Sequence, residues 1–144
     1  MGKKRVIKKG QTESDTLNKG SLSSKVSKRR LEVGTIHIQA TYNNLLISLI
    51  DEKGGMVLSS SSGAMGFKGS KKGTPFAAGK VAENLVDKAQ NLGLKEVQVV
   101  IKGVGAGRES AVRALISKGL SVRSITDVTP VPFNGPKPPR PRRV

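Results

Sequence analysis

The sequence contains no cysteine, no tryptophan and one histidine, and only 3% of its residues are aromatic. Without cysteine the chain forms no disulfide and offers no thiolate to a metal ion, which fits a reducing compartment. A single histidine excludes Cys/His metal sites and His-dependent catalytic triads within one chain. His37 lies in a strand-like pattern, where a solvated position is the simplest interpretation. With so few aromatic side chains, recognition of any ligand must depend mainly on charge and shape.

Long hydrophobic runs are also missing. No stretch approaches the roughly 20 apolar residues that cross a bilayer, so we expect no membrane partner. The basic N-terminus is not followed by an apolar run and contains Glu13 and Asp15, so it matches neither a secretory signal nor a transit peptide. No strand-borne carboxylates point to a common centre, so we expect no metal, no cofactor, no small-molecule substrate and no enzymatic activity.

Positive charge is what the sequence has in excess. It has 26 Lys and Arg against 10 Asp and Glu, a net charge of +16. Residues 1–30 hold ten basic and two acidic residues, and the last eight hold four basic residues and no acidic one. Such a balance favours a polyanionic partner: nucleic acid, an anionic membrane or an acidic protein. We predict a basic N-terminal extension at 1–33, a globular domain at 34–128 and a proline-rich basic arm at 129–144.

Hydrophobic periodicity predicts an α/β fold for the globular part. Polar and apolar residues alternate over 35–40, and apolar runs follow at 45–50 and 56–61. Turn residues separate the three segments, so they predict an antiparallel meander. The nearly continuous apolar run at 45–50 is typical of a central strand that is covered on both faces.

Two helices are predicted after the meander. Thr74 suits an N-cap, Pro75 fits the first helical position, and Gly93 ends the first helix. Its expected apolar stripe is Phe76, Val81, Ala82, Leu85, Val86, Ala89 and Leu92. The second helix is expected over 108–118, ending at Gly119. Its expected inward residues are Ala111, Val112, Leu115 and Ile116.

Strands at 96–101 and 120–126 flank the second helix. A strand–helix–strand unit of this size predicts a parallel pair. The whole prediction is a five-stranded mixed sheet with two helices, built from an antiparallel meander and a parallel strand–helix–strand unit.

The segment KGVGAGRES, residues 102–110, follows a predicted strand and opens a helix. Backbone N–H groups and the helix dipole collect phosphate in this context. The segment is neither a dinucleotide fingerprint nor a Walker loop, because a fourth glycine and a Lys-Ser/Thr pair are absent. The alternative is a tight turn that only lets the helix pack on the strand. We favour an anion site, suited to an RNA phosphate, formed by Lys102, Gly103, Gly105, Gly107 and Arg108.

A second loop, GFKGSKKGTPF, places Phe67 among Lys68, Lys71 and Lys72. Lysines neutralise phosphates, and an aromatic ring can stack on a splayed base. We expect the lysines to contact nucleic acid. Stacking by Phe67 and packing of Phe67 into the core both stay open.

The C-terminal arm carries six of the seven prolines. Residues 138–143 satisfy a PxxPxR pattern, which predicts an adaptor whose tail recruits a polyproline-binding domain. A nuclear-localisation pattern is also satisfied. A single extended polyanion, however, explains both basic extensions and both basic loops together. A free nucleotide-binding enzyme is a weaker third alternative.

Several motifs point to one family: GFKGSKKGTPFAA, KGVGAGRES, RALISKGL, ITDVTPVPFNG and the closing RRV. From about Gly34 to Val144 the chain resembles, in motif order and spacing, the eleventh protein of the small ribosomal subunit, bacterial or organellar type. The resemblance implies an RNase H-like body that binds small-subunit ribosomal RNA on the platform, beside neighbouring small-subunit ribosomal proteins. It also implies proximity to mRNA and exit-site tRNA, a location in cytoplasmic or organellar ribosomes, and no enzymatic activity.

The functional regions that the resemblance implies are 42–44, 66–72, 102–108 and 134–143. Together with the basic residues of the N-terminal extension, they give the candidate rRNA-binding residues: Lys3, Lys4, Arg5, Lys8, Lys9, Lys28, Arg29, Arg30, Asn43, Asn44, Phe67, Lys68, Lys71, Lys72, Lys102, Gly103, Gly105, Gly107, Arg108, Asn134, Lys137, Arg140, Arg142 and Arg143.

The chain departs from the family pattern at Val104, Ala106, Phe133, Pro136 and Pro141. These departures affect individual contacts in the glycine loop and the arm.

Asn134 precedes Gly135, and a glycine does not hinder attack of its backbone nitrogen on the Asn amide. Asn134 is therefore a candidate site of isoaspartate formation.

Overall fold

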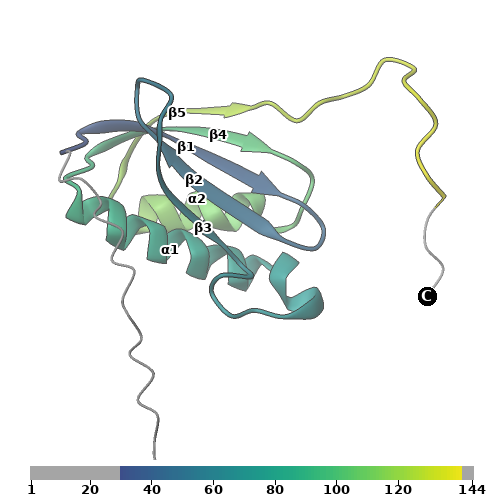
Figure 1. Ribbon diagram of the computed structural model, residues 1–144, viewed down its shortest axis with the longest axis horizontal. Helices are drawn as coiled ribbons and strands as arrows, with labels where there is room; N and C mark the ends of the chain where they lie inside the picture. Colours follow the sequence, from purple (N-terminus) through teal and green to yellow (C-terminus); the bar gives the residue numbers. More distant parts are fainter. Residues whose placement is uncertain (1–29, 141–144) are drawn as a thin grey trace, which may run out of the picture.

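The computed structural model describes residues 30–140 (Figure 1). Along the chain its elements are β1 (Val33–Ala40), β2 (Leu45–Ile50), β3 (Met56–Ser61), the short 3-10 helix η1 (Gly69–Gly73), α1 (Pro75–Asn91), β4 (Glu96–Lys102), α2 (Gly107–Ser117) and β5 (Ser121–Asp127). Nine of the candidate RNA-binding residues lie outside the described part of the chain: Lys3, Lys4, Arg5, Lys8, Lys9, Lys28, Arg29, Arg142 and Arg143. Pro141 of the PxxPxR pattern lies outside it too.

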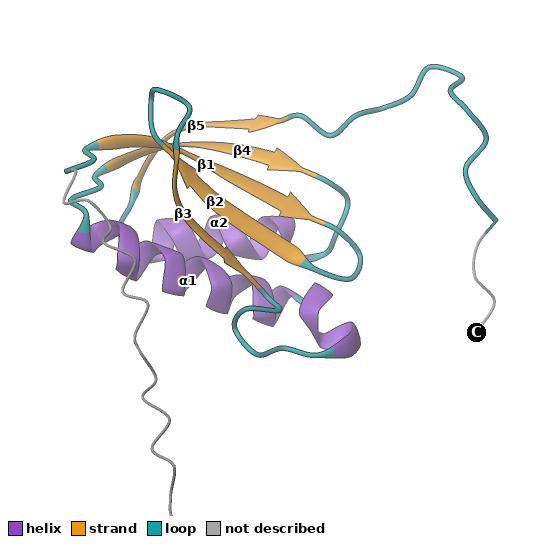
Figure 2. Ribbon diagram, in the orientation of Figure 1, coloured by secondary structure: helices purple, strands orange, loops and turns teal. Residues whose placement is uncertain are grey.

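The five strands form one open, mixed sheet in the order β3-β2-β1-β4-β5 (Figure 2). β1 pairs with β2, and β2 with β3, in antiparallel fashion. β4 runs parallel to both β1 and β5. The predicted meander and the predicted parallel pair are therefore confirmed, as is the α/β class with five strands and two helices.

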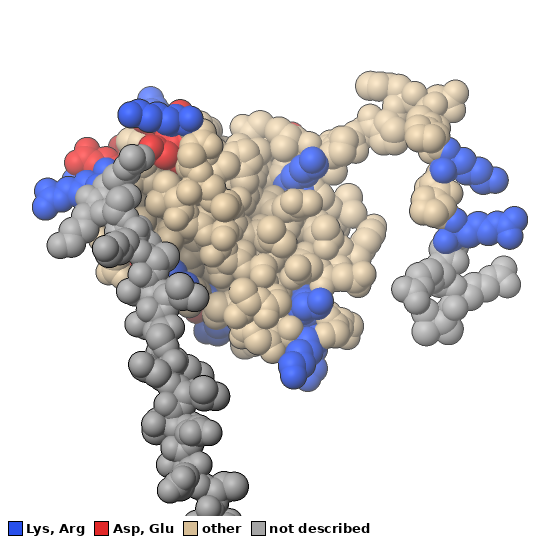
Figure 3. Space-filling model, viewed as in Figure 1, with Lys and Arg blue, Asp and Glu red and all other residues tan. Residues whose placement is uncertain are grey.

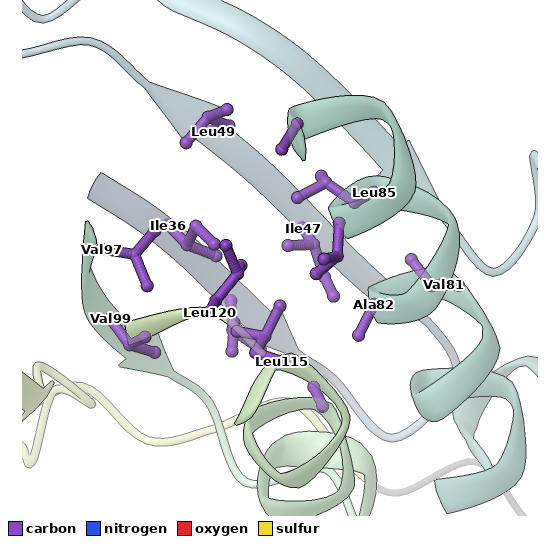
Figure 4. Close-up of a cluster of buried hydrophobic side chains, with 14 of the residues drawn as sticks. Ile36, Ile47, Leu49, Val81, Ala82, Leu85, Val97, Val99, Leu115 and Leu120 are labelled. Carbon is purple, nitrogen blue, oxygen red and sulfur yellow. The ribbon is translucent and has the colours of Figure 1, made fainter. Parts of the chain in front are cut away.

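Both helices cover the same face of the sheet (Figure 1). The strand order explains this, because the connections from β3 to β4 and from β4 to β5 join parallel strands and move in the same direction along the sheet. Crossovers of the same hand that move in one direction place their helices on one side. Strand residues Ile36, Ile47 and Val99 meet helix residues Leu85 and Leu115 in this single core layer (Figure 4).

The prediction that residues 45–50 form a central strand covered on both faces is wrong. β1 holds the central position, and β2 alternates between buried Leu45, Ile47 and Leu49 and residues that face away from the helices. Leu46 is 47% exposed. An apolar run shows that both faces of a strand can be buried. Only the placement of the helices decides which face of the sheet is covered.

The capping predictions for α1 are confirmed. The Thr74 hydroxyl accepts a hydrogen bond from the Ala77 N–H at 3.3 Å, and Pro75 occupies the first turn. Gly93 follows the helix with φ 89°, a conformation that glycine adopts without strain.

Two residues of the predicted apolar stripes are exposed, and Leu92 and Val112 are only half-buried. Phe76 is 68% exposed, because it lies in the first turn of α1 and helical side chains point back toward the N-terminus. Ile116 is 52% exposed. The buried stripe of α2 is narrower than expected and consists of Gly107, Ala111 and Leu115.

The chain enters the fold before the predicted start of the globular domain at residue 34. Leu31 is 8% exposed and belongs to the hydrophobic core. Its N–H donates to the Leu92 carbonyl at 3.0 Å, and the Glu32 carbonyl accepts from the Lys95 N–H at the same distance. No helix within residues 30–140 is long and apolar enough to cross a membrane.

Candidate nucleic-acid interface

The basic and glycine-rich segments meet at one end of the molecule, where β1, β4 and β5 end and where α1 and α2 begin (Figure 1). We call this region the loop end. It consists of the β1–β2 turn (41–44), the β3–α1 loop (62–74), the β4–α2 loop (103–106) and the first residues after β5 (128–129). Arg30, which precedes β1, lies at the opposite end of the sheet and is not part of this region.

Glycines allow the segments of the loop end to touch through their backbones. A Cβ atom on Gly73 would clash with the Tyr42 carbonyl, and one on Gly105 would clash with the Thr41 carbonyl. A Cβ atom on Gly103 would likewise clash with the Ala40 carbonyl, and this residue has φ 106°. Three loops that are far apart in the sequence are thus packed into one surface.

Two glycines of the predicted anion loop use their amides inside the protein. The Gly103 N–H donates to Thr129 Oγ1 at 3.0 Å, and the Gly105 N–H donates to the Ala40 carbonyl at 3.1 Å. These contacts give both residues a structural role, as the tight-turn alternative requires. Anion binding at this loop stays a prediction, and it now depends on the exposed Lys102 more than on the glycine amides.

Arg108 also has a role within the fold. Its Nη1 donates to the Gly103 carbonyl at 2.8 Å, and its Nη2 forms an ion pair with Asp127. Asp127 Oδ1 accepts hydrogen bonds from the Thr129 hydroxyl at 2.6 Å and the Thr129 N–H at 2.9 Å. The hydrogen bonds from Thr129, followed by that from Arg108, lower the pKa of Asp127 to about 2. We call Gly103, Arg108, Asp127 and Thr129 the arm-root cluster.

The arm-root cluster could not be found from the sequence. Asp127 is 19 residues from Arg108, and Thr129 is 26 residues from Gly103. Only the parallel pairing of β4 with β5 brings these positions together. The cluster fixes where the C-terminal arm leaves the body.

Basic side chains at the loop end and on the arm lack acidic partners. Within residues 30–140, no ion pair involves any of the following: Lys68, Lys71, Lys72, Lys102, Lys137 and Arg140. On the face shown in Figure 3, acidic side chains gather mainly at the end of the molecule farthest from the arm. The loop end and the arm therefore present a surface whose positive charge is available to an external anion.

Phe67 does not enter the core. It is half-buried, and its ring packs edge-to-face against Phe76, with centroids 6.2 Å apart and planes at 84°. Phe76 carries most of the exposed aromatic surface of this pair, and Lys80 Nζ lies 5.9 Å from its ring centroid. Phe76 was expected in the apolar stripe of α1, and the sequence did not predict its exposure beside the β3–α1 loop. Its position directly after Pro75 was the available signal, because side chains in the first helical turn point back toward the N-terminus of the helix.

The predicted asparagines occupy turns. Thr41 Oγ1 donates to the Asn44 carbonyl and accepts from the Asn44 N–H, both at 3.0 Å, and these bonds close the β1–β2 turn. Asn43 is exposed, and the buried Asn44 Oδ1 has no hydrogen-bond partner within residues 30–140. Asn134 has φ 52°, a left-handed conformation that asparagine tolerates. Its conversion to isoaspartate stays a prediction.

The arm extends away from the sheet (Figure 1), and all of residues 130–140 are exposed. Phe133 is 98% exposed. The arm thus makes few contacts with the body beyond the arm-root cluster, and Lys137 and Arg140 are free to meet a partner.

The sequence is similar to those of known proteins. The model of the family described as Ribosomal protein S11 matches residues 34–143. Small ribosomal subunit protein uS11c of Cyanidioschyzon merolae (strain NIES-3377 / 10D) is 55% identical over 120 residues, which are 83% of this chain and 99% of that protein. Small ribosomal subunit protein uS11 of Solibacter usitatus (strain Ellin6076) is 51% identical over 120 residues, 83% of this chain and 89% of that protein.

These similarities cover the loop end, both helices and most of the arm. They confirm the resemblance that the motifs predict, and they agree with the expectation that the protein is not an enzyme, since the relatives are ribosomal proteins. The chain belongs to the ribosomal protein S11 family.

Proposed function

We propose that the protein is a structural component of the small ribosomal subunit that binds small-subunit ribosomal RNA through its loop end and its two basic extensions. Family membership supports this role, because the relatives are named as small-subunit ribosomal proteins. The position that we propose is the platform, beside other small-subunit proteins and near mRNA and exit-site tRNA, in a bacterial or organellar ribosome.

The observation that carries the proposal is the set of basic side chains at the loop end that have no acidic partner. Lys68 and Lys71 are exposed and Lys72 is half-buried, and all three follow one another around η1. Flexible ammonium groups on a backbone held by glycine contacts suit phosphates at several positions along an RNA chain. The body thus supplies a shaped basic surface, and the arm extends it.

The lysines around η1 provide the test. We expect the variant K68Q/K71Q/K72Q to bind small-subunit ribosomal RNA more weakly and to lower the slope of log affinity against log salt by about 2, since each lost phosphate contact removes about 0.7 to 0.9 from it. Affinities measured by filter binding between about 50 and 200 mM salt supply the slope.

A matched control is available in the same chain. Lys53, Lys88 and Lys95 are exposed, lie away from the loop end and can be changed to Gln with the same loss of charge. The variant K53Q/K88Q/K95Q should keep nearly the wild-type slope. An equal loss of RNA affinity and of salt slope in the two triple variants would show that only net charge matters. That result would contradict a binding surface at the loop end.

A further inference from the structure

Phe76 presents an aromatic ring to solvent at the loop end. The residue lies in the first turn of α1, four positions after Lys72 of the β3–α1 loop, and is 68% exposed. A single exposed apolar residue is common on protein surfaces and means little alone. The groups around this ring give it significance.

The ring of Phe76 is supported from within the protein. Phe67 packs edge-to-face against it at 6.2 Å, and Phe67 is itself half-buried. This contact limits the motion of the Phe76 side chain. A ligand that covers the ring therefore causes only a small further loss of side-chain entropy. The pair therefore combines a supporting ring with an exposed one.

One cation lies close to the exposed ring, and two more precede it in the chain. Lys80 Nζ lies 5.9 Å from the Phe76 centroid, within the range of a cation–π contact. Lys80 also pairs with Glu83 at 2.9 Å, but both side chains are substantially exposed, so this pair is weak and can rearrange. Lys71 and Lys72 end the 3-10 helix that leads into α1.

An aromatic ring among cations fits one class of ligand better than others. An unstacked nucleobase has a flat π face for the ring and phosphates on both sides for the lysines. An acidic peptide would use the lysines but gain little from the ring. An apolar protein surface would require a continuous apolar patch, whereas Lys80 lies beside the Phe76 ring and the lysine-bearing η1 leads into the same helix.

We propose that Phe76 is a base-stacking residue. It receives one unstacked base of single-stranded RNA, while Lys80 and the lysines around η1 contact the adjacent phosphates. The inference rests on the proposed RNA-binding function and assigns the stacking contact to Phe76, with Phe67 as its support.

The test compares the RNA affinity of full-length variants with and without an aromatic ring at position 76. The variant Phe76→Leu should bind small-subunit ribosomal RNA about tenfold more weakly, in line with the loss of one base–aromatic stack. Its salt slope should equal that of the wild type, because no charge is removed. Phe76→Tyr keeps a ring and should bind within about twofold of the wild type, as base stacking tolerates either aromatic ring.

The outcomes separate this inference from the proposed function. Wild-type affinity of Phe76→Leu, with weakened binding of K68Q/K71Q/K72Q, overturns the stacking role and leaves RNA binding intact. Wild-type affinity of all these variants contradicts both. Equal weakening by Phe76→Leu and Phe76→Tyr also overturns it, since a stacking ring would be preserved in the second.

Photochemical cross-linking gives an independent measurement in intact small subunits. Ultraviolet irradiation followed by mass spectrometry should place a nucleotide adduct on Phe76. An adduct on Phe67 with none on Phe76 would assign stacking to the supporting ring and overturn the proposal. Melting temperatures of the variants should match the wild type, because Phe76 is mostly exposed.

Discussion

The Asp127 carboxylate joins the start of α2 to the root of the C-terminal arm. It accepts two hydrogen bonds from Thr129, the first arm residue beyond Val128, and forms an ion pair with Arg108 at the start of α2. Arg108 in turn holds the Gly103 carbonyl. The charged form of Asp127 is therefore favoured in the folded protein, and its pKa falls from 3.8 to about 2.

This pKa gives a prediction for stability against pH. A carboxyl whose folded pKa is depressed stabilises the fold above its unfolded pKa and loses that contribution as the pH falls through the folded pKa. Asp127→Asn should be less stable than the wild type at pH 7, and the difference should shrink between pH 3.8 and about 2. Urea unfolding across this range measures the difference. Glu109→Gln, which removes an exposed pair with Arg113, is the control and should have little effect at any pH.

At the scale of elements, the β4–α2 loop is held against the end of β1. The loop is shaped by glycines whose backbones touch Ala40 and Thr41, and by the hydrogen bond from Gly105 to Ala40. These contacts were not apparent from the sequence, where the same glycines fit an anion loop equally well. What distinguishes the two interpretations is the distance to a strand that lies more than sixty residues earlier.

Alanine substitutions test this packing. Gly103→Ala combines a positive φ of 106° with a clash against the Ala40 carbonyl, so we expect a loss of about 2–4 kcal/mol in the free energy of unfolding. Gly54 has φ 81° but open space around its Cβ position. Gly54→Ala should therefore cost only about 1 kcal/mol, the price of the left-handed conformation alone. Chemical denaturation measures the free energy of unfolding of both variants. An equal loss in the two would show that the close approach of Gly103 to the Ala40 carbonyl contributes nothing.

Elements differed in how well the sequence predicted them. The alternation of β1 and the capping residues Thr74 and Pro75 are local signals, and the structure follows them. η1 was missed, because a five-residue 3-10 helix has too few positions for a periodic pattern. The sequence did not predict the exposure of Leu46, Phe76 and Ile116. Whether a side chain is buried depends on which other elements pack against its helix or strand, and a periodic pattern in the sequence does not say which elements these are.

At the scale of the whole molecule, the acidic side chains are distributed unevenly: in Figure 3 they gather at the end farthest from the arm, where basic side chains lie beside them. The loop end and the arm carry basic side chains without acidic partners, and the opposite end contains the β2–β3 turn with Asp51 and Glu52. Such a distribution orients an approaching polyanion toward the loop end. The arm-root cluster then sets the direction in which the arm continues from it.

The arm distinguishes RNA binding from the adaptor alternative. Changing Arg140, Arg142 and Arg143 to Gln should reduce the salt slope of RNA binding by about 2, because phosphate contacts are lost. Changing Pro138 and Pro141 to Ala should leave that slope unchanged and weaken binding only slightly, through greater flexibility of the free arm. Filter binding across a salt series measures both. A loss of RNA affinity confined to the proline variant would contradict phosphate contacts by the three arginines.

The sequence by itself determined the fold class, the order of the elements, the basic character of the partner surface and the family. These depend on periodicity, composition and motifs, which are properties of neighbouring residues in the chain. Only the tertiary structure decided that four separate segments form one loop end, that Arg108 binds Asp127, and that Phe76 faces solvent. The reason is physical: these features depend on how parallel strands and one-sided helices bring distant residues together, and no local pattern encodes those distances.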